Sequence, residues 1–330
     1  MNELFTLLKR GNKSALTAAI VNFLVSILKG AAFLFTGNVA MFAETLHSLG
    51  DAANQLFVFV GSALSKKAPT DRFPSGFGRV VNLVLLGAVL VVGIMAFEAG
   101  KEGWHHIWHP TESTGFLINL LVLGGATLME SFVLFKAMKE ILHETDTHVP
   151  WYKMVPASFA NYKKANPATK LVFLEDSVAT SGGLLAMVAV IIAHFTPFHQ
   201  AEGIASMIIA VLMVYVVTVV FLDNAAGLIG EADEELEAQI GDLIYKIKGV
   251  KDVKEVVVIK EGEVVHVELK IEVDPLISVA EADDIQDIVR KKIMALKQVT
   301  DVTIELDEDD GVPNWEEEQA KREELEEVLK

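Results

Sequence analysis

The residues with the clearest chemical potential are a histidine and an aspartate within an otherwise apolar stretch. His47 and Asp51 are separated by Ser-Leu-Gly, and on a helix this spacing places both side chains on the same face, one turn apart. An imidazole and a carboxylate held in this way supply half of a tetrahedral site for a borderline divalent cation such as Zn²⁺. The spacing therefore predicts a metal site on this segment.

A second pair of ionisable residues, Glu175 and Asp176, lies in another apolar stretch further along the chain. Ionisable groups in the hydrocarbon of a membrane cost at least ~2.5–3.5 kcal/mol each, so they generally indicate function. We expect this acidic pair to complete the metal site that His47 and Asp51 begin. The alternative is a hydrogen-bonded cluster that ties two helices together without binding a metal.

Six stretches are long and apolar enough to cross a bilayer, which takes ~20 residues. They are residues 14–36, 38–64, 79–103, 114–139, 169–194 and 201–223. Polar backbone groups in hydrocarbon must be paired internally, so each stretch is predicted to be a helix of a membrane domain spanning 14–223. Lys and Arg are concentrated in residues 1–13, 65–79 and 139–170, whereas the alternate connections lack them. This pattern places both termini in the cytoplasm.

The last hundred residues differ in composition. The chain has a formal charge of −17, but residues 1–230 hold 15 basic and 15 acidic residues, so the whole excess lies in 231–330. Such an acidic segment argues against nucleic-acid binding. The chain contains no cysteine, which excludes disulfides, zinc-thiolate sites and thiol catalysis. Residues 1–13 lack the pattern of a cleavable signal peptide, so the first apolar stretch is expected to remain as an anchor.

A small soluble domain is predicted after a linker at 224–232. Residues 233–247 and 278–296 have helical patterns, the second with a capping box at Ser278 and Glu281. Residues 252–260, 263–273 and 299–307 read as strands, and Glu261-Gly262 as a hairpin turn. We therefore expect a cytoplasmic ferredoxin-like α+β domain at 233–307, with αββαβ order, an antiparallel sheet and a role in dimerisation. Residues 308–330 form an acidic tail, either a solvated helix or disordered.

The chain resembles the cation diffusion facilitator family over about residues 10–307. Besides the His47–Asp51 motif, the resemblance rests on the segments 71–79, 176–182 and 271–275, in order and at matching topological places. Residues 47–55, 129–131 and 227–232 bring the chain nearest the branch that includes a mitochondrial zinc transporter. The resemblance implies a dimeric, multi-pass divalent-metal exporter.

The resemblance also implies a metal site between the second and fifth spans, formed by His47, Asp51 and Asp176. The family usually has His or Asp four residues before the last of these, where this chain has Val172. Glu175 cannot simply replace that ligand, because adjacent helical residues point about 100° apart. Glu175 from another angle, Asn54 or a water is expected to complete the site. Because the fourth ligand is not firmly defined, the site could also bind Fe²⁺, Mn²⁺ or Co²⁺.

Other polar residues are weaker candidates. Glu44 could attract cations or cap a helix, and Lys29 is expected to pair with Glu130 rather than to snorkel. In the soluble domain, only His266 and Asp283 are candidates for a regulatory metal site. Histidines 105, 106, 109, 194 and 199 fall on the outer connections, where they could capture metal or simply lie at the interface. The glycine pairs 124–125 and 182–183 are expected to allow close helix packing.

The sequence thus predicts a metal/proton antiporter that works by alternating access, with Zn²⁺ as cargo and a prokaryotic cytoplasmic membrane as its location. Protons compete with the metal for the ligands, and an imidazole ordinarily titrates near pH ~6.5. The alternatives are the same mechanism with Mn²⁺ or Fe²⁺, and a membrane metal sensor or scaffold that does not transport. We expect no enzyme activity and no resident cofactor, since the sequence lacks the motifs of metalloproteases, nucleophile-elbow hydrolases and phosphate-binding loops.

Overall fold

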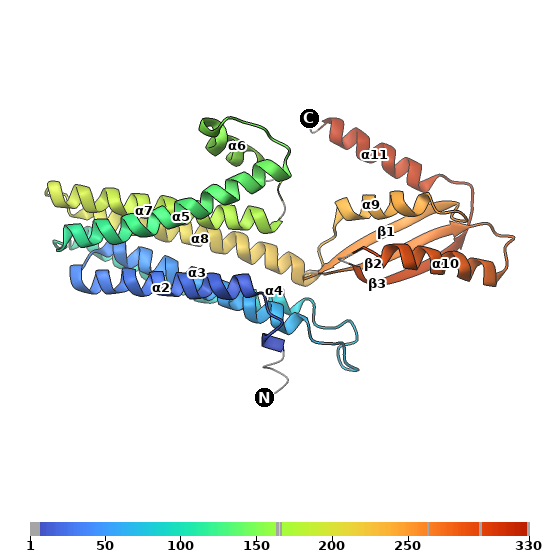
Figure 1. Ribbon diagram of the computed structural model, residues 1–330, viewed down its shortest axis with the longest axis horizontal. Coiled ribbons are helices and arrows are strands. Elements are labelled where there is room, and N and C mark those ends of the chain that lie inside the picture. Colours follow the sequence, from blue (N-terminus) through green and yellow to red (C-terminus); the bar gives the residue numbers. More distant parts are fainter. Residues whose placement is uncertain (1–6, 163–164, 166, 263, 297–298, 329–330) are drawn as a thin grey trace. The chain divides into compact units, whose positions relative to one another are not determined.

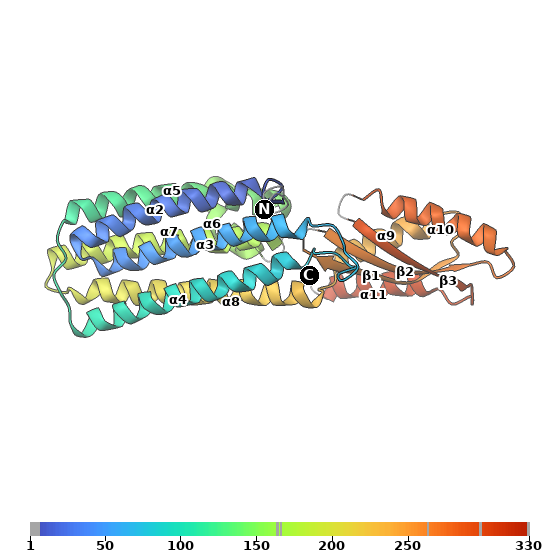
Figure 2. The same cartoon turned by 90° about the horizontal axis from the view of Figure 1, so that it is seen from below.

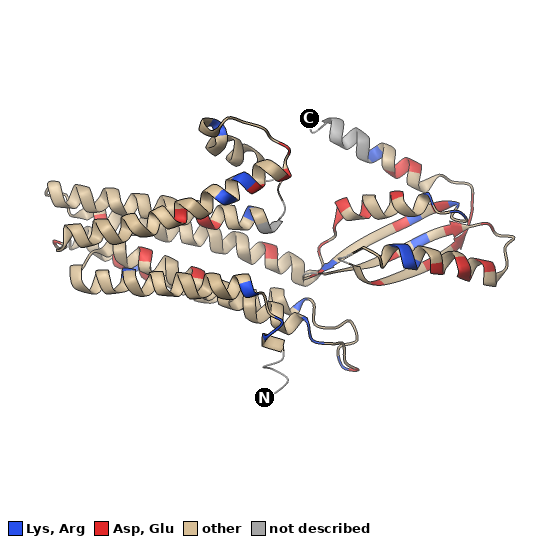
Figure 3. Cartoon of the chain, in the orientation of Figure 1, with Lys and Arg blue, Asp and Glu red and all other residues tan. Residues whose placement is uncertain are grey.

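A computed structural model describes residues 7–162, 165, 167–262, 264–296 and 299–328. The chain divides into two compact units. One unit comprises Met1–Leu64 and Leu83–Asn224, and the other comprises Ser65–Asn82 and Ala225–Lys330. The first unit is helical, and its helices carry few charged residues (Figure 3). The second unit carries the sheet and most of the acidic residues.

The helices of the first unit follow the predicted apolar stretches with shifts of a few residues at their ends. They are α2 (Lys13–Thr36), α3 (Val39–Ser65), α4 (Val80–Trp108), α5 (Phe116–Glu144), α7 (Pro167–Phe195) and α8 (Gln200–Ile229) (Figures 1 and 2). Within the described residues, α2, α4, α5, α7 and α8 are long and apolar enough to cross a membrane. Helix α3 is equally long, but its polar residues, including His47 and Asp51, lower its mean hydropathy.

The connection between α5 and α7 is not the plain loop that the sequence suggested. It contains the 3₁₀ turn η1 (Trp151–Lys153) and the short helix α6 (Met154–Asn161). Met154 of α6 and Phe173 of α7 are buried with Met138 and Ile141 of α5 in one apolar cluster. This cluster fixes the end of α5 against the beginning of α7, which is the helix that carries the predicted acidic pair.

Short turns and small residues determine how the long helices meet. Gly37 ends α2 with φ 69°, a conformation that glycine adopts without strain, and its N–H donates to the Phe33 carbonyl at 2.7 Å. The Asn38 side chain then accepts from the Met41 N–H at 2.7 Å and starts α3. Consequently α2 and α3 lie next to each other in opposite directions. Farther along, α5 packs against α7 and α2.

The second unit contains a three-stranded sheet with helices in the predicted αββαβ order. Its elements are α9 (Glu234–Tyr245), β1 (Asp252–Glu261), β2 (Val264–Val273), α10 (Val279–Ile293) and β3 (Val299–Glu308). The strand order is β1-β2-β3. Strands β1 and β2 are antiparallel, but β2 and β3 are parallel. The expectation of an antiparallel sheet was therefore right for β1 and β2 but wrong for β3. Helix α10 carries the chain back to the end of the sheet where β2 begins, so β3 runs in the same direction as β2.

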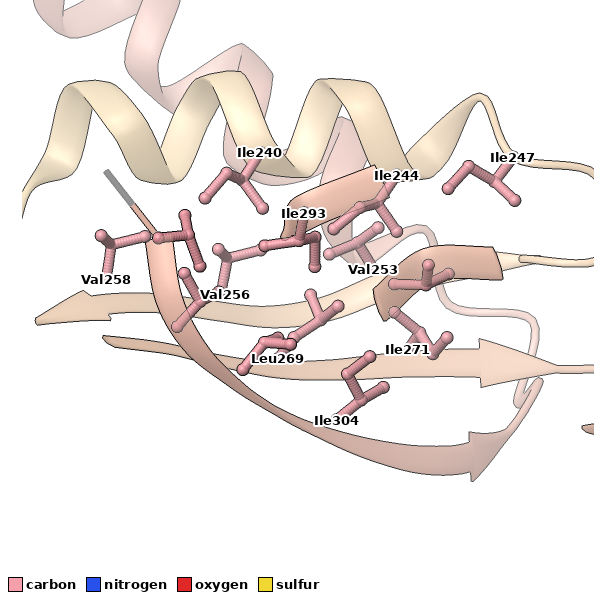
Figure 4. Packing of buried hydrophobic residues seen from close by; sticks show 14 of the residues in the cluster. Ile240, Ile244, Ile247, Val253, Val256, Val258, Leu269, Ile271, Ile293 and Ile304 are labelled. Atoms are coloured by element: carbon pink, nitrogen blue, oxygen red, sulfur yellow. The ribbon is translucent and has the colours of Figure 1, made fainter. Parts of the chain in front are cut away.

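The core of this unit lies between the sheet and its helices. Ile240 and Ile244 of α9 and Ile293 of α10 are fully buried against alternate residues of the strands, such as Val258 and Ile271 (Figure 4). The strict alternation in β2 places its valine, leucine and isoleucine side chains in this core. The capping box predicted at Ser278 and Glu281 is present at the start of α10.

The acidic tail is partly docked rather than wholly solvated or disordered. It forms α11 (Asn314–Val328), in which Trp315 is only 3% exposed. The Asp252 carboxylate accepts from the Asn314 and Trp315 N–H groups at 2.6 and 3.2 Å, and the indole donates to Asp242 at 3.1 Å. A side chain at Gly241 would overlap the indole ring. One buried tryptophan thus anchors a helix whose other residues are mostly charged.

Candidate metal site

Helix α3 presents its polar side chains as a stripe. Glu44, His47, Asp51 and Asn54 recur every three or four residues, so they share one face of the helix. Glu44, His47 and Asn54 are 0%, 4% and 8% exposed, and Asp51 is partly buried. A buried polar stripe on an apolar helix indicates that the stripe faces other polar groups and not lipid.

His47 and Asp51 lie close together but do not satisfy each other. The His47 Nε2 atom is 3.6 Å from Asp51 Oδ2, which is longer than a hydrogen bond. The same nitrogen has no hydrogen-bond partner among the described residues. An unpaired buried polar atom costs about 1–3 kcal/mol. The pair therefore has the spacing predicted from the sequence and is free to accept a ligand.

The two acidic residues of α7 have different environments. Glu175 Oε1 accepts a hydrogen bond from Asn54 Nδ2 at 2.9 Å. Asp176 Oδ2 is buried without a hydrogen-bond partner in the described structure, and its charge interacts with those of Asp51 and His47. Adjacent helical residues leave the helix about 100° apart. Asp176 therefore leaves α7 in a different direction from Glu175, whose carboxylate is held by the Asn54 amide.

We call the candidate ligands the metal group. It consists of His47, Asp51 and Asp176, with Glu175 beside it. Among the described residues, no set of three His, Asp or Glu side chains is close enough to enclose a metal ion. The donor set nonetheless combines one imidazole nitrogen with carboxylate oxygens, which suits Zn²⁺ and also harder ions such as Mn²⁺.

A second polar cluster lies one turn away along α3. The Lys29 ammonium of α2 donates to Glu44 at 2.7 Å, to Ser48 at 3.0 Å and to Glu130 of α5 at 3.0 Å. The predicted pairing of Lys29 with Glu130 is confirmed. Glu44 is not at a helix end and does not face an open mouth; it is 0% exposed and bound to Lys29. Its expected attraction of free cations is replaced by an internal ion pair.

The remaining histidines of the membrane helices are mostly engaged. The His194 ring stacks on Phe116 with centroids 4.1 Å apart, and His106 Nε2 lies 3.2 Å from the His199 carbonyl oxygen. A cavity of about 190 Å³ lies at the ends of α5, α7 and α8. Its lining comprises Glu112, Ser113, Phe116, Val190, Ala193, His194, Thr196 and His199. The packed rings favour the interfacial interpretation of these histidines over metal capture.

The two weak candidates in the soluble unit are not brought together. His266 faces two carboxylates, with Nδ1 3.3 Å from Asp301 and Nε2 3.5 Å from Glu268. Asp283 is exposed on α10. The geometry gives this pair no common site.

A carboxylate cluster that the sequence did not reveal surrounds Lys254 in the same unit. The Lys254 ammonium lies 3.2 Å from Asp307, 3.2 Å from Glu272 and 3.3 Å from Asp310. Interactions with these three carboxylates, including hydrogen bonds to Asp307 and Asp310, raise the pKa of Lys254 above its usual range. Bonds from Lys270 and Lys254 in turn lower the pKa of Asp307. Asp307 and Asp310 are 53 and 56 residues from Lys254 in sequence, so no local pattern predicts these contacts.

Two comparisons with known protein families cover nearly the whole described chain. The cation efflux transmembrane domain matches residues 15–229, and the cytoplasmic domain of cation efflux proteins matches residues 232–309. The chain belongs to the cation efflux family, the cation diffusion facilitators. The resemblance inferred from the sequence is confirmed. Because this family consists of cation transporters and not of enzymes, the expectation that the chain is not an enzyme is also confirmed.

Individual members of the cation efflux family are distantly similar. A mitochondrial proton-coupled zinc antiporter of Mus musculus is 26% identical over 75% of this chain and 44% of its own length. A metal tolerance protein of Arabidopsis thaliana is 23% identical over 69% of this chain and 49% of its own. A manganese efflux system protein of Bacillus subtilis is 22% identical over 88% and 93%. The chain spans less than half the length of the first two relatives.

Proposed function

We propose that this chain exports a divalent transition metal, Zn²⁺ first among the candidates, in exchange for protons. The observation that carries the proposal is that His47 Nε2, which lies 3.6 Å from Asp51 on α3, and Asp176 Oδ2 on α7 are both buried without hydrogen-bond partners among the described residues. A cation that bound there would supply the missing partner to both atoms. The zinc cargo and proton coupling of the mouse relative support the same reaction.

The chemistry of the ligands explains the coupling. Metal binding needs a neutral imidazole and ionised carboxylates, so protons and metal compete for the same atoms. A proton gradient then favours release of the metal on the acidic side. Alternating access around a site between two helices allows the exchange without an open channel. The proposed ligands are His47, Asp51 and Asp176, and Glu175 is proposed to support the site from beside them.

The same proposal assigns a topology. Helix α3 also crosses the membrane and brings the number of spans to six, because its polar stripe is buried among other helices instead of facing lipid. Residues 14–223 form the transport domain, residues 1–13 and both termini face the cytoplasm, and residues 224–232 form a linker. The unit at 233–307, with its αββαβ order, acts as a cytoplasmic ferredoxin-like dimerisation domain, followed by the acidic tail 308–330. A prokaryotic cytoplasmic membrane is the proposed location.

Mn²⁺ is the second candidate for the cargo. Asp51, Glu175 and Asp176 provide three carboxylates to one imidazole, and oxygen ligands suit Mn²⁺ better than Zn²⁺. The Bacillus subtilis relative, which aligns over nearly its whole length, is a manganese efflux protein. Fe²⁺ shares the same ligand preferences and belongs in the same comparison.

Uptake of metal into liposomes that contain the purified chain tests this function. We expect Zn²⁺ to accumulate when a pH gradient is imposed and accumulation to stop when an ionophore dissipates the gradient. Competition with Mn²⁺ and Fe²⁺ then orders the cargoes. Metal binding without flux of any of the three ions would contradict transport and would support a membrane metal sensor.

A further inference from the structure

A fully buried ammonium lies in the membrane unit outside the metal group. Lys29 is 0% exposed, and each of its three N–H donors has an oxygen partner, from Glu44, Ser48 and Glu130. The partners come from two other helices, at 2.7, 3.0 and 3.0 Å. A lysine ammonium surrounded by two carboxylates and a hydroxyl occupies the kind of oxygen-lined position that would otherwise suit a free cation.

The carboxylates of this cluster keep unused oxygens. Glu44 Oε1 and Glu130 Oε2 are buried without hydrogen-bond partners in the described structure. Helix α7 leaves room for the first of them, because a Cβ at Gly182 would lie 2.5 Å from Glu44 Oε1. Two carboxylates with free oxygens thus lie within the same helix bundle as Asp176, whose charge interacts with that of Glu130.

Charge balance shows why the ammonium matters to transport. Asp51, Glu175 and Asp176 accompany His47 in the metal group, and Glu44 and Glu130 lie next to them. One divalent cation neutralises two negative charges, so five carboxylates without a fixed cation would attract a second ion. The Lys29 ammonium adds one positive charge between Glu44 and Glu130 and uses one oxygen of each, so these two carboxylates attract a second ion less strongly. It stays in place because it is covalently attached to α2.

We propose that Lys29 is a tethered cation that holds Glu44 and Glu130 and so confines the transported metal to His47, Asp51 and Asp176. This inference rests on the proposed function, because it explains why the proposed transport site binds only one metal ion. Lys29 acts as a positioning and specificity residue and does not touch the metal. It keeps two additional carboxylates from becoming ligands that would hold the cargo too tightly to release.

Metal content of the full-length protein tests this proposal. The purified chain in detergent is equilibrated with ZnSO₄, and bound metal is counted by plasma mass spectrometry. We expect about one ion per chain in the wild type and in Lys29→Arg, and about two in Lys29→Met, because the freed carboxylates become ligands. The double variant Lys29→Met/Glu44→Gln should return to about one ion. Lys101→Met, which removes an exposed ammonium, is the matched control and should be unchanged.

A second variant keeps the test decisive if Lys29→Met does not fold. Glu44→Gln retains Lys29 and removes one carboxylate charge. If Glu44 is held by Lys29 and is not a ligand, the Zn²⁺ Kd should stay within about threefold, whereas losing a ligand or its close support costs about 10–100-fold. A folded Lys29→Met with one ion per chain, or a large loss of affinity in Glu44→Gln, would overturn the proposal. A wild type that binds no metal would instead refute the proposed function.

Discussion

The metal group and the Lys29 cluster both use polar residues of α3, yet their nitrogen atoms are satisfied in opposite ways. Lys29 has a partner for every ammonium proton. One turn farther along α3, His47 Nε2 has no hydrogen-bond partner among the described residues, and neither does Asp176 Oδ2. Both clusters are buried between helices of similar apolar character. The difference is that one contains its own cation and the other does not.

The comparison separates polar groups that shape the protein from those that bind a ligand. A buried ion pair whose donors are all used stabilises one arrangement of helices, and removing one partner costs several kcal/mol. Buried donors and acceptors left unpaired cost about 1–3 kcal/mol each unless something binds to them. Both clusters keep unpaired carboxylate oxygens, so the nitrogen atoms distinguish them: Lys29 uses all of its donors, whereas His47 Nε2 has no partner among the described residues.

The largest expected effect follows from removing a carboxylate of the metal group. Asp51→Ala or Asp176→Ala should lower gradient-driven Zn²⁺ uptake into liposomes by about 100-fold or more, because a proposed metal ligand is lost. Asp223→Ala is the matched control, since Asp223 is an exposed aspartate on α8. Near-normal uptake in either site variant would show that the unpaired atoms are not the transport site.

A change of ligand type should alter the choice of metal more than the rate. His47→Asp replaces a nitrogen with oxygen in a group already rich in carboxylates. We expect the ratio of Mn²⁺ to Zn²⁺ uptake to rise about tenfold, because oxygen ligands favour the harder ion. Competition assays in the same liposomes measure this ratio. An unchanged ratio would mean that His47 does not contact the ion.

A smaller effect is expected from disturbing the contact between α5 and α7. A Cβ at Gly183 would overlap the Thr127 side chain, whereas a Cβ at Gly125 meets nothing within 4 Å. Overpacking of this kind costs about 1–3 kcal/mol. Gly183→Ala should therefore lower the thermal unfolding temperature and reduce Zn²⁺ uptake several-fold, while Gly125→Ala should do neither. Equal behaviour of the two variants would exclude a role for this packing in placing Asp176.

The smallest effect is expected in the soluble unit, where the satisfied polar groups are exposed. Hydrogen bonds from the Ser278 N–H and hydroxyl lower the pKa of Glu281. A lowered folded-state pKa stabilises the start of α10 above the unfolded value of about 4.3, and this stabilisation is lost as the pH falls through the folded-state pKa.

Hydrogen exchange of the first turn of α10, in the full-length chain, measures this contribution. Glu281→Gln should speed exchange modestly at pH 6, and the difference from the wild type should disappear near pH 3 once intrinsic rates are corrected. Zn²⁺ uptake should be unchanged. A difference of equal size at both pH values would show that the charge of Glu281 does not contribute.

Local patterns in the sequence predicted most of the elements. Apolar length gave the long helices within a few residues, alternation gave β2, and Ser278 with Glu281 gave the start of α10. The direction of β3 was wrong, because strand pairing depends on how the chain returns through α10 and not on the strand's own residues. Helix α11 was left undecided, since one buried tryptophan in a charged segment has no periodic signal.

For the candidate site, the sequence predicted the arrangement within one helix but not the contacts between helices. The spacing of His47 and Asp51 was enough to place them on one face, because residues four apart on a helix lie about one turn apart on the same side. The bond between Asn54 and Glu175 and the three partners of Lys29 join helices that are far apart in sequence, so they depend on packing. Ser48 had a weaker signal, as the residue next to His47 on a polar stripe. Its role depends on the Lys29 ammonium, which donates to it from another helix.

X-ray absorption spectroscopy of Zn²⁺ bound to the full-length protein tests most directly whether the unpaired atoms of α3 and α7 hold the cargo. We predict one imidazole nitrogen at about 2.0 Å with oxygen ligands completing the shell, and loss of the imidazole signal in His47→Ala. A shell with two or more imidazoles would contradict the assignment, because only His47 is available in the metal group. An imidazole signal that persists in His47→Ala would contradict it equally.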